Sequence, residues 1–167
     1  MAIRRSVIKR SAPSANDPAV ALAKARSFCA YQERCKNEVI FHLHSFGLSE
    51  EQTTVIISNL EEEDFLNEER FALAYARGKF SQLQWGRIKI KAELLSKGLS
   101  DSLIRMAMET IPDDEYLKCI ESLVEAKRNS LSSIDDLHVL KHKIYSFLAS
   151  KGFEEHLIYN EINKIKT

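Results

Sequence analysis

Glycine and proline are scarce in this sequence, whose 167 residues include only 5 Gly and 3 Pro. Proteins built from strands and tight turns use both residues repeatedly to reverse the chain, so the scarcity argues against an all-β architecture. The hydrophobic fraction of 44% and the charged fraction of 29% are typical of a soluble globular protein. The length suffices for one core of ordinary size or for a row of small modules.

Cysteine pairs and long apolar runs are also missing. Cys29, Cys35 and Cys119 form no CxxC pair and are odd in number, which favours a reducing compartment and argues against a disulfide scaffold or a zinc site. No apolar run approaches the roughly 18 residues that a membrane-spanning helix needs. The basic start MAIRRSVIKRSAPSANDP lacks the long apolar segment of a secretory signal. We therefore expect a cytoplasmic protein that does not enter a membrane.

The motifs of common catalytic sites are absent as well. The sequence contains no GxSxG, no Walker loop and no GxGxxG. His138 and His142 stand at i and i+4, but no HExxH arrangement and no third ligand accompany them, so we interpret them as surface or interface histidines. We expect no catalytic residues, no cofactor and no metal.

The charge is balanced overall but unevenly distributed. The sequence has 24 Lys+Arg against 24 Asp+Glu, which is not the profile of a protein that coats nucleic acid. Residues 61–69, EEEDFLNEE, carry six acids and no base. Residues 70–105 carry two acids and eight bases, a surplus of six: Arg70, Arg77, Lys79, Arg87, Lys89, Lys91, Lys97 and Arg105.

One pattern occurs three times, around Gly47, Gly98 and Gly152, which are 51 and 54 residues apart. A base precedes each glycine by eleven residues, and apolar residues recur eight and four residues before it, one after it and thirteen after it. The bases are Lys36, Arg87 and Lys141, and the apolar sets are Val39/Ile90/Ile144, Leu43/Leu94/Leu148, Leu48/Leu99/Phe153 and Leu60/Ile111/Ile165. A period of about 50 residues is the signature of stacked supersecondary units.

Each copy predicts a helical hairpin. Glycine tolerates the left-handed conformation that closes a helix. Ser49 and Ser100 stand where the N-cap of the next helix belongs, and Ser49 with Gln52 fits a capping box. The third copy has Glu154 at this position, which is a weaker cap.

A further helix precedes each hairpin, at about 18–31, 65–80 and 113–129. We therefore predict an all-α fold: a tandem array of three three-helix, helix-turn-helix-like repeats, elongated and curved. The predicted repeats cover residues 18–61, 62–111 and 112–167, after a flexible basic N-terminal arm over residues 1–17.

The segment Arg87–Lys91 alternates polar and apolar residues as a strand would, but strong helix formers follow it and the other two copies are helical. As a helix, it places Arg87 and Lys91 one turn apart on one face, where we expect both to be exposed. Ile88, Ala92 and Leu95 then line a second face. A solvated helix with salt bridges is the alternative interpretation.

Trp85 stands at the entrance of this basic helix, either as a core anchor or as an aromatic interface anchor. If the basic block is a binding surface, its candidate residues for a partner or DNA are Lys36, Arg70, Arg77, Lys79, Trp85, Arg87, Lys89, Lys91 and Lys141.

The run FLNEERFALAYARGKFSQLQWGRIKIKAELLSKGLSDSLI resembles the central module of the RecX family of bacterial recombination regulators. The matching motifs are the acidic entry with Arg70-Phe71-Ala72, then Arg77, Gly86-Arg87-Ile88, Glu93-Leu94 and Lys97-Gly98-Leu99. The first module, with Ala30 to Cys35, is also similar, and the third agrees in length and periodicity more than in identity.

This resemblance implies a row of modules in the groove of the RecA–DNA filament, where it would suppress ATP hydrolysis, strand exchange and filament growth and so regulate recombination, DNA repair and the SOS response. Because the chain is neutral overall, we expect weak, salt-sensitive binding to single-stranded DNA alone. We expect a monomer. Two alternatives stay open: a helix-turn-helix transcription factor that inserts the Arg87–Lys91 helix into the major groove, and a helical-repeat adaptor for another protein.

Overall fold

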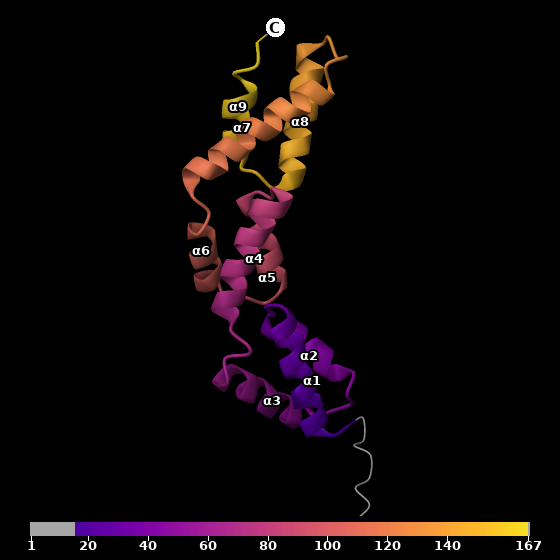
Figure 1. Ribbon diagram of the computed structural model, residues 1–167. Coiled ribbons are helices and arrows are strands. Elements are labelled where there is room, and N and C mark those ends of the chain that lie inside the picture. Colours follow the sequence, from indigo (N-terminus) through magenta and orange to yellow (C-terminus); the bar gives the residue numbers. More distant parts are fainter. Residues whose placement is uncertain (1–15, 167) are drawn as a thin grey trace, which may run out of the picture. The chain divides into compact units, whose positions relative to one another are not determined.

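The computed structural model describes residues 16–166, and all regular secondary structure within that range is helical (Figure 1). The all-α prediction is therefore confirmed. The chain divides into two compact units, one ending at Leu66 and the other beginning at Asn67. The predicted arm over residues 1–17 lies outside the described residues, except for Asn16 and Asp17.

The first unit contains α1 (Pro18–Tyr31), α2 (Lys36–His44) and α3 (Glu50–Glu62), which pack on one another. Helix α1 begins at the predicted residue because the Asp17 carboxylate accepts the N–H of Ala19 and proline fits the first helical turn. The core of this unit consists of Ala21, Ala25, Cys29, Val39, Leu43, Ile56, Ile57, Leu60 and Leu66.

The second unit contains two groups of three helices. The first group is α4 (Glu68–Leu83), α5 (Arg87–Ser96) and α6 (Asp101–Glu109), and the second is α7 (Asp113–Ser130), α8 (Leu137–Lys151) and α9 (Glu155–Ile162). Within each group every helix packs against the other two. Helix α4 starts three residues later than predicted because the Asn67 side chain accepts the N–H of Arg70 and so caps it.

The repeated pattern corresponds to helix ends and core positions. Gly47, Gly98 and Gly152 adopt the expected positive φ, at 61°, 86° and 86°. The apolar residues four and eight positions before each glycine are fully buried: Val39, Leu43, Ile90, Leu94, Ile144 and Leu148. The three copies therefore share a packing arrangement and not merely a composition.

The predicted caps also form. The Ser49 side chain accepts the N–H of Gln52, whose side chain accepts the N–H of Ser49, and the Ser100 side chain accepts the N–H of Leu103. Glu154 precedes α9 but makes no side-chain cap bond, because its carboxylate is engaged elsewhere, as described below.

The alternating segment Arg87–Lys91 is helical, as predicted. Helix α5 buries Ile90 and Leu94 completely, while Ile88 and Leu95 remain 53% and 48% exposed. The alternation of polar and apolar residues over Arg87–Lys91 therefore does not reflect a strand. It arises because Ile88 faces outward while Ile90 is buried.

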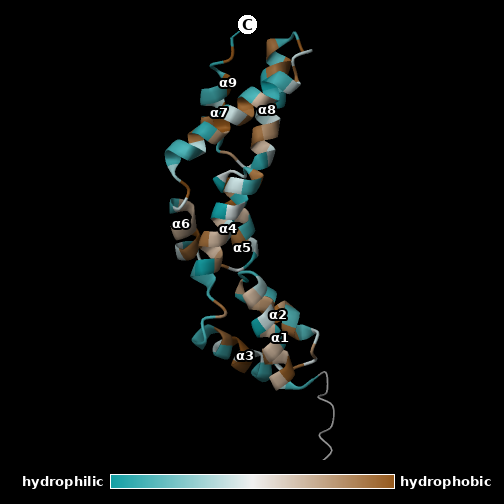
Figure 2. Cartoon of the chain, in the orientation of Figure 1, coloured by the Kyte–Doolittle hydropathy of each residue, from teal (hydrophilic) through white to brown (hydrophobic). Residues whose placement is uncertain are grey.

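Hydrophilic and hydrophobic residues are interspersed along the helices (Figure 2). Within residues 16–166, no helix combines the length and the apolar character needed to cross a bilayer.

Candidate functional site

The N-terminus of α5 meets the C-terminus of α8 through backbone hydrogen bonds. The N–H of Gly86 donates to the carbonyl of Lys151 at 2.8 Å, and the N–H of Ile88 donates to the carbonyl of Gly152 at 3.0 Å. The first N–H groups of a helix and its last carbonyls have no partners within their own helix. Here each helix end supplies the partners that the other lacks, and the two helix dipoles attract each other at the contact.

This contact requires glycine on both sides. A Cβ on Gly86 would lie 2.1 Å from the carbonyl oxygen of Gly152, and a Cβ on Gly152 would lie 2.3 Å from the Cβ of Lys89. Heavy atoms do not approach so closely without displacing the backbone. The two glycines therefore fix how the α4–α6 group and the α7–α9 group dock within the second unit.

A buried tyrosine from α7 supports the same junction. The Tyr116 hydroxyl accepts the N–H of Arg87 at 2.8 Å and donates to the Glu154 carboxylate at 2.6 Å. Burial, and then the hydrogen bond to Glu154, raise the pKa of Tyr116 far above its ordinary value. Its ring packs near Phe80 and Phe153, with centroids 5.7 and 5.3 Å away.

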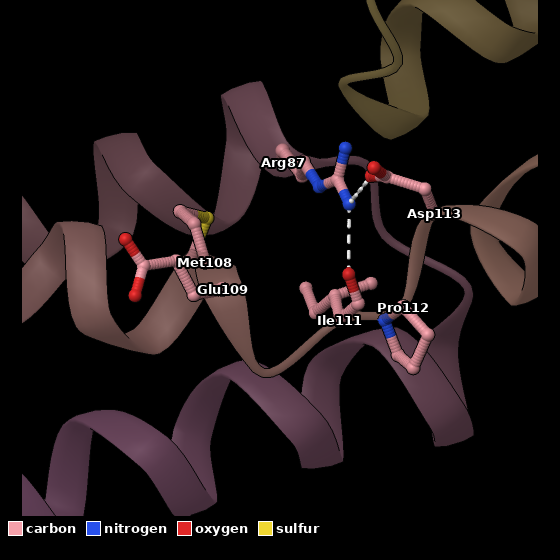
Figure 3. Close-up of a pocket in the computed structure, with 6 residues that line it drawn as sticks. All are labelled: Arg87, Met108, Glu109, Ile111, Pro112 and Asp113. Carbon is pink, nitrogen blue, oxygen red and sulfur yellow. Dashed lines mark hydrogen bonds and ion pairs between the residues drawn. The ribbon is translucent and has the colours of Figure 1, made fainter.

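The Arg87 side chain belongs to this junction, so the expectation that it is exposed is wrong. Its guanidinium donates to the carbonyl of Ile111 at 2.8 Å and to Asp113 at 2.6 Å (Figure 3). It also lies 4.3 Å from the centroid of the Tyr116 ring. Only 24% of the side chain is accessible. A helix wheel of α5 alone could not reveal this, because the covering groups come from the α6–α7 connection and from α7.

The base that stands eleven residues before each glycine makes a similar contact in the first unit. The Lys36 ammonium, at the start of α2, forms an ion pair with Glu61 near the end of α3, at 2.7 Å. Arg87, at the start of α5, likewise reaches the residues that follow α6. In both cases the base joins the second helix of a group to the end of its third.

A set of lysines held by aromatic rings surrounds the junction. The ammonium groups of Lys79 and Lys89 lie 4.9 and 4.5 Å from the centroid of the Trp85 ring. Those of Lys127 and Lys151 lie 5.0 and 5.5 Å from the centroid of Phe147. The Lys151 ammonium also donates to the carbonyl of Leu83, beside Trp85. We call this set the lysine–aromatic surface: Lys79, Trp85, Lys89, Lys127, Phe147 and Lys151.

The four lysines of this surface keep their charges unneutralised. Across residues 16–166, none of them forms an ion pair. Cation–π contacts of this kind contribute roughly 0.5–1 kcal/mol at exposed sites and restrict the long side chains. The surface therefore carries four positive charges, drawn from four helices, each beside an aromatic ring.

The structure brings together only some of the predicted binding residues. Lys79, Trp85 and Lys89 meet in the lysine–aromatic surface. Arg77, two residues before Lys79 on α4, and Lys91 on α5 are exposed and lie outside this set. Arg70 is half-buried in the first turn of α4, Lys36 is paired with Glu61, and Lys141 lies on α8 in a separate hollow.

Sequence reasoning missed Lys127, Phe147 and Lys151. They are far from Trp85 in the chain, and their link to its segment is the hydrogen bond from Lys151 to the Leu83 carbonyl, beside the docking of Gly86 on Gly152. The sequence held one signal of this contact, a pair of glycines: Gly152 belongs to the repeat, whereas Gly86 has no glycine at the equivalent positions of the other copies. No group of three or more His, Cys, Asp or Glu side chains that could hold a metal occurs among residues 16–166.

Comparison with known proteins identifies relatives of this chain. The family described as RecX, second three-helix domain, matches residues 67–108. This range covers α4, α5 and all of α6 except Glu109, its last residue. The chain is 27% identical over 146 residues to the regulatory protein RecX of Bacillus cytotoxicus, covering 87% of this chain and 54% of that protein. It is 30% identical over 141 residues to that of Oceanobacillus iheyensis, covering 84% and 51%. The chain thus spans about half the length of the curated relatives it matches.

Solved structures show the same fold. The crystal structure of RecX from Lactobacillus salivarius superposes with a TM-score of 0.79 at 27% identity, over 90% of this chain and 97% of that one. A second crystal structure of a regulatory protein RecX superposes with a TM-score of 0.75 at 21% identity, over 89% and 74% of the two chains.

Proposed function

We propose that this chain, which belongs to the RecX family, binds the RecA–DNA filament and restrains its ATP hydrolysis and strand exchange. In this proposal it acts as a cytoplasmic, monomeric binding protein without catalysis, and so regulates recombination and DNA repair. The family relationship supports the choice of partner, and the lysine–aromatic surface is the observation that supports a site on this chain.

The chemistry of that surface suits a charged filament. Four lysines without ion-pairing partners favour contact with phosphate groups or with acidic side chains. The Trp85 ring already has two ammonium groups beside it, which favours a role in holding lysines over a role in stacking on bases. Lysine contacts of this type carry no sequence information, which agrees with a partner that is read by its shape and charge.

The transcription-factor alternative is less well supported by the geometry. Helix-turn-helix proteins read base edges mainly with residues at the N-terminus of the recognition helix. In this chain the first turn of α5 is occupied by the carbonyls of Lys151 and Gly152 and by the Tyr116 hydroxyl. The N-terminus of α5, which would have to contact base edges in the major groove, is therefore covered by other parts of the chain.

Sedimentation with preassembled filaments tests the proposal. The chain should pellet with RecA assembled on single-stranded DNA, and far less of it should pellet with either component alone. The Lys79→Glu, Lys89→Glu double variant should remain in the supernatant, while the Lys24→Glu, Lys118→Glu double variant, altered at exposed lysines elsewhere, should pellet normally. Tight binding to one duplex sequence without RecA would refute the proposal.

A further inference from the structure

Helices α8 and α9 enclose a hollow of about 390 Å³ that the lysine–aromatic surface does not include. His138, Lys141 and His142 line it from α8, and Asn163 lines it at the end of α9. Its apolar part is formed by Ile162 together with Tyr145 and Tyr159, whose ring centroids are 5.2 Å apart. Phe147 and Lys151 are on the opposite side of α8 by helical rotation, so the hollow is a separate site.

The repeat shows which site of the preceding group corresponds to this hollow. Lys141 and Arg87 each stand eleven residues before their glycine, and Asn163 and Glu109 each stand eleven residues after it. Arg87 and Glu109 line a hollow of about 420 Å³ at the end of α6 (Figure 3). The two hollows therefore lie at equivalent places in the α4–α6 group and the α7–α9 group.

In the α4–α6 group, the beginning of the next helix forms one wall of the equivalent hollow and pairs with its base. Its wall includes Pro112 and Asp113, the N-cap and first residue of α7, and the Asp113 carboxylate accepts a hydrogen bond from Arg87 at 2.6 Å. An acidic first turn is the usual composition of a helix N-terminus, because its carboxylates oppose the helix dipole. The chain therefore contains an example of an acidic helix start that pairs with the base at this position of the repeat.

Within the described part of the chain, no helix follows α9. Among residues 16–166, no carboxylate forms an ion pair with Lys141, whereas Arg87 has Asp113. Tyr159, at the edge of the hollow, is 45% exposed. One charged group near the hollow is acidic, the Glu155 carboxylate, which accepts the Tyr145 hydroxyl. A single lysine beside a carboxylate suits one carboxylate of a partner better than the dense charge of a nucleic acid strand.

We propose that the α8–α9 hollow binds the acidic first turn of a helix from a protein partner. Lys141 would take the place of Arg87 and pair with a partner carboxylate, while the Tyr145–Tyr159 pair packs against an apolar residue just before that turn. Tyrosine side chains combine a large apolar contact with little loss of conformational freedom, which makes them effective in such a role. This site is independent of the function proposed above, because it uses another face of α8.

A peptide copied from the chain itself provides the probe. Fluorescein-labelled TIPDDEYLK, the sequence of residues 110–118, should bind the full chain saturably and shift the amide resonances of α8 and α9 around Lys141 and Tyr159. The matched peptide TIPNNQYLK, without carboxylates, should bind at least about tenfold more weakly. Tyr159→Ser should weaken binding by a similar factor, with Tyr31→Ser, at a tyrosine that is 84% exposed on α1, as its control.

Charge reversal gives the sharper test. Lys141→Glu should abolish binding of TIPDDEYLK and create binding of the charge-reversed peptide TIPKKKYLK, while Lys143→Glu, at an exposed neighbour on the same helix, should change neither. Melting curves of each variant establish that it is folded, and the rescue by the reversed peptide cannot arise from unfolding. Absence of saturable binding to the folded chain would overturn the proposal, as would binding indifferent to Lys141. Stronger perturbation of the same resonances by oligo-dT than by the peptide would also overturn it, in favour of a nucleic acid site.

Discussion

Gly86 lies directly against Gly152, close enough that the Gly86 N–H donates to the carbonyl immediately before Gly152 and that neither residue has room for a Cβ. This contact joins the α4–α6 group to the α7–α9 group. It also accompanies the hydrogen bond from the Lys151 ammonium to the carbonyl of Leu83, so the lysine–aromatic surface depends on it.

Substitution of Gly86 by alanine should separate the two groups. The added methyl would lie 2.1 Å from a backbone oxygen, so the unit must shift, and overpacking of this kind typically destabilises by about 1–3 kcal/mol. Urea denaturation followed by the fluorescence of Trp85, the single tryptophan, measures the loss. Gly78→Ala is the matched control: its Cβ would have no neighbour within 4 Å in the middle of α4, so this change should stabilise by about 0.5–1 kcal/mol.

Tyr116→Phe should destabilise the second unit although the ring remains. The substitution removes the acceptor of the Arg87 N–H and the donor to Glu154, and it leaves partly buried polar groups without partners. Such a loss costs about 1–3 kcal/mol, measurable by urea denaturation. An unchanged free energy of unfolding would mean that water replaces the hydroxyl at no cost.

Stability should also depend on alkaline pH through the same residue. Burial and the bond to Glu154 raise the pKa of Tyr116 in the folded chain, so its stabilising contribution is complete below the ordinary tyrosine pKa of about 10. As the pH rises above that value the unfolded chain ionises first, and stability declines by up to about 1.4 kcal/mol per pH unit for this one proton. The difference in unfolding free energy between the wild type and Tyr116→Phe should therefore shrink above that pH. A difference that is constant with pH would contradict the role assigned to the hydroxyl.

Arg87 and Lys91 should respond oppositely to substitution. Arg87→Lys should destabilise the chain, because a single ammonium cannot satisfy the Ile111 carbonyl and Asp113 while lying over the Tyr116 ring. Lys91→Glu, at an exposed position, should change the melting temperature little. Thermal unfolding of the two variants side by side tests this. Equal melting temperatures would contradict the stabilising contacts assigned to Arg87.

The sequence was most informative about structure that is local. The first helix was predicted at about 18–31 from its apolar spacing, and α1 covers Pro18–Tyr31. The three glycines marked helix ends because a residue without a side chain adopts their φ angles easily. The repeated apolar positions identified much of the core, since the same hairpin packing recurs in each copy.

The candidate site was only partly predictable because it depends on contacts between distant segments. Lys79, Trp85 and Lys89 are close in sequence and were identified together. The exposure of Arg87 was wrongly predicted because its partners, Ile111, Asp113 and Tyr116, come from segments whose positions a single helix pattern does not specify.

We propose above all that this chain restrains a RecA filament through its lysine–aromatic surface. The most direct test is DNA-dependent ATP hydrolysis by the cognate RecA, titrated with the wild type, with Lys79→Glu, Lys89→Glu and with the control Lys24→Glu, Lys118→Glu. We predict loss of hydrolysis at substoichiometric wild-type or control protein, and at least about tenfold more of the first double variant for the same effect, with all three proteins folded. Undiminished hydrolysis at a stoichiometric excess of folded wild type, or equal inhibition by all three, would contradict the account.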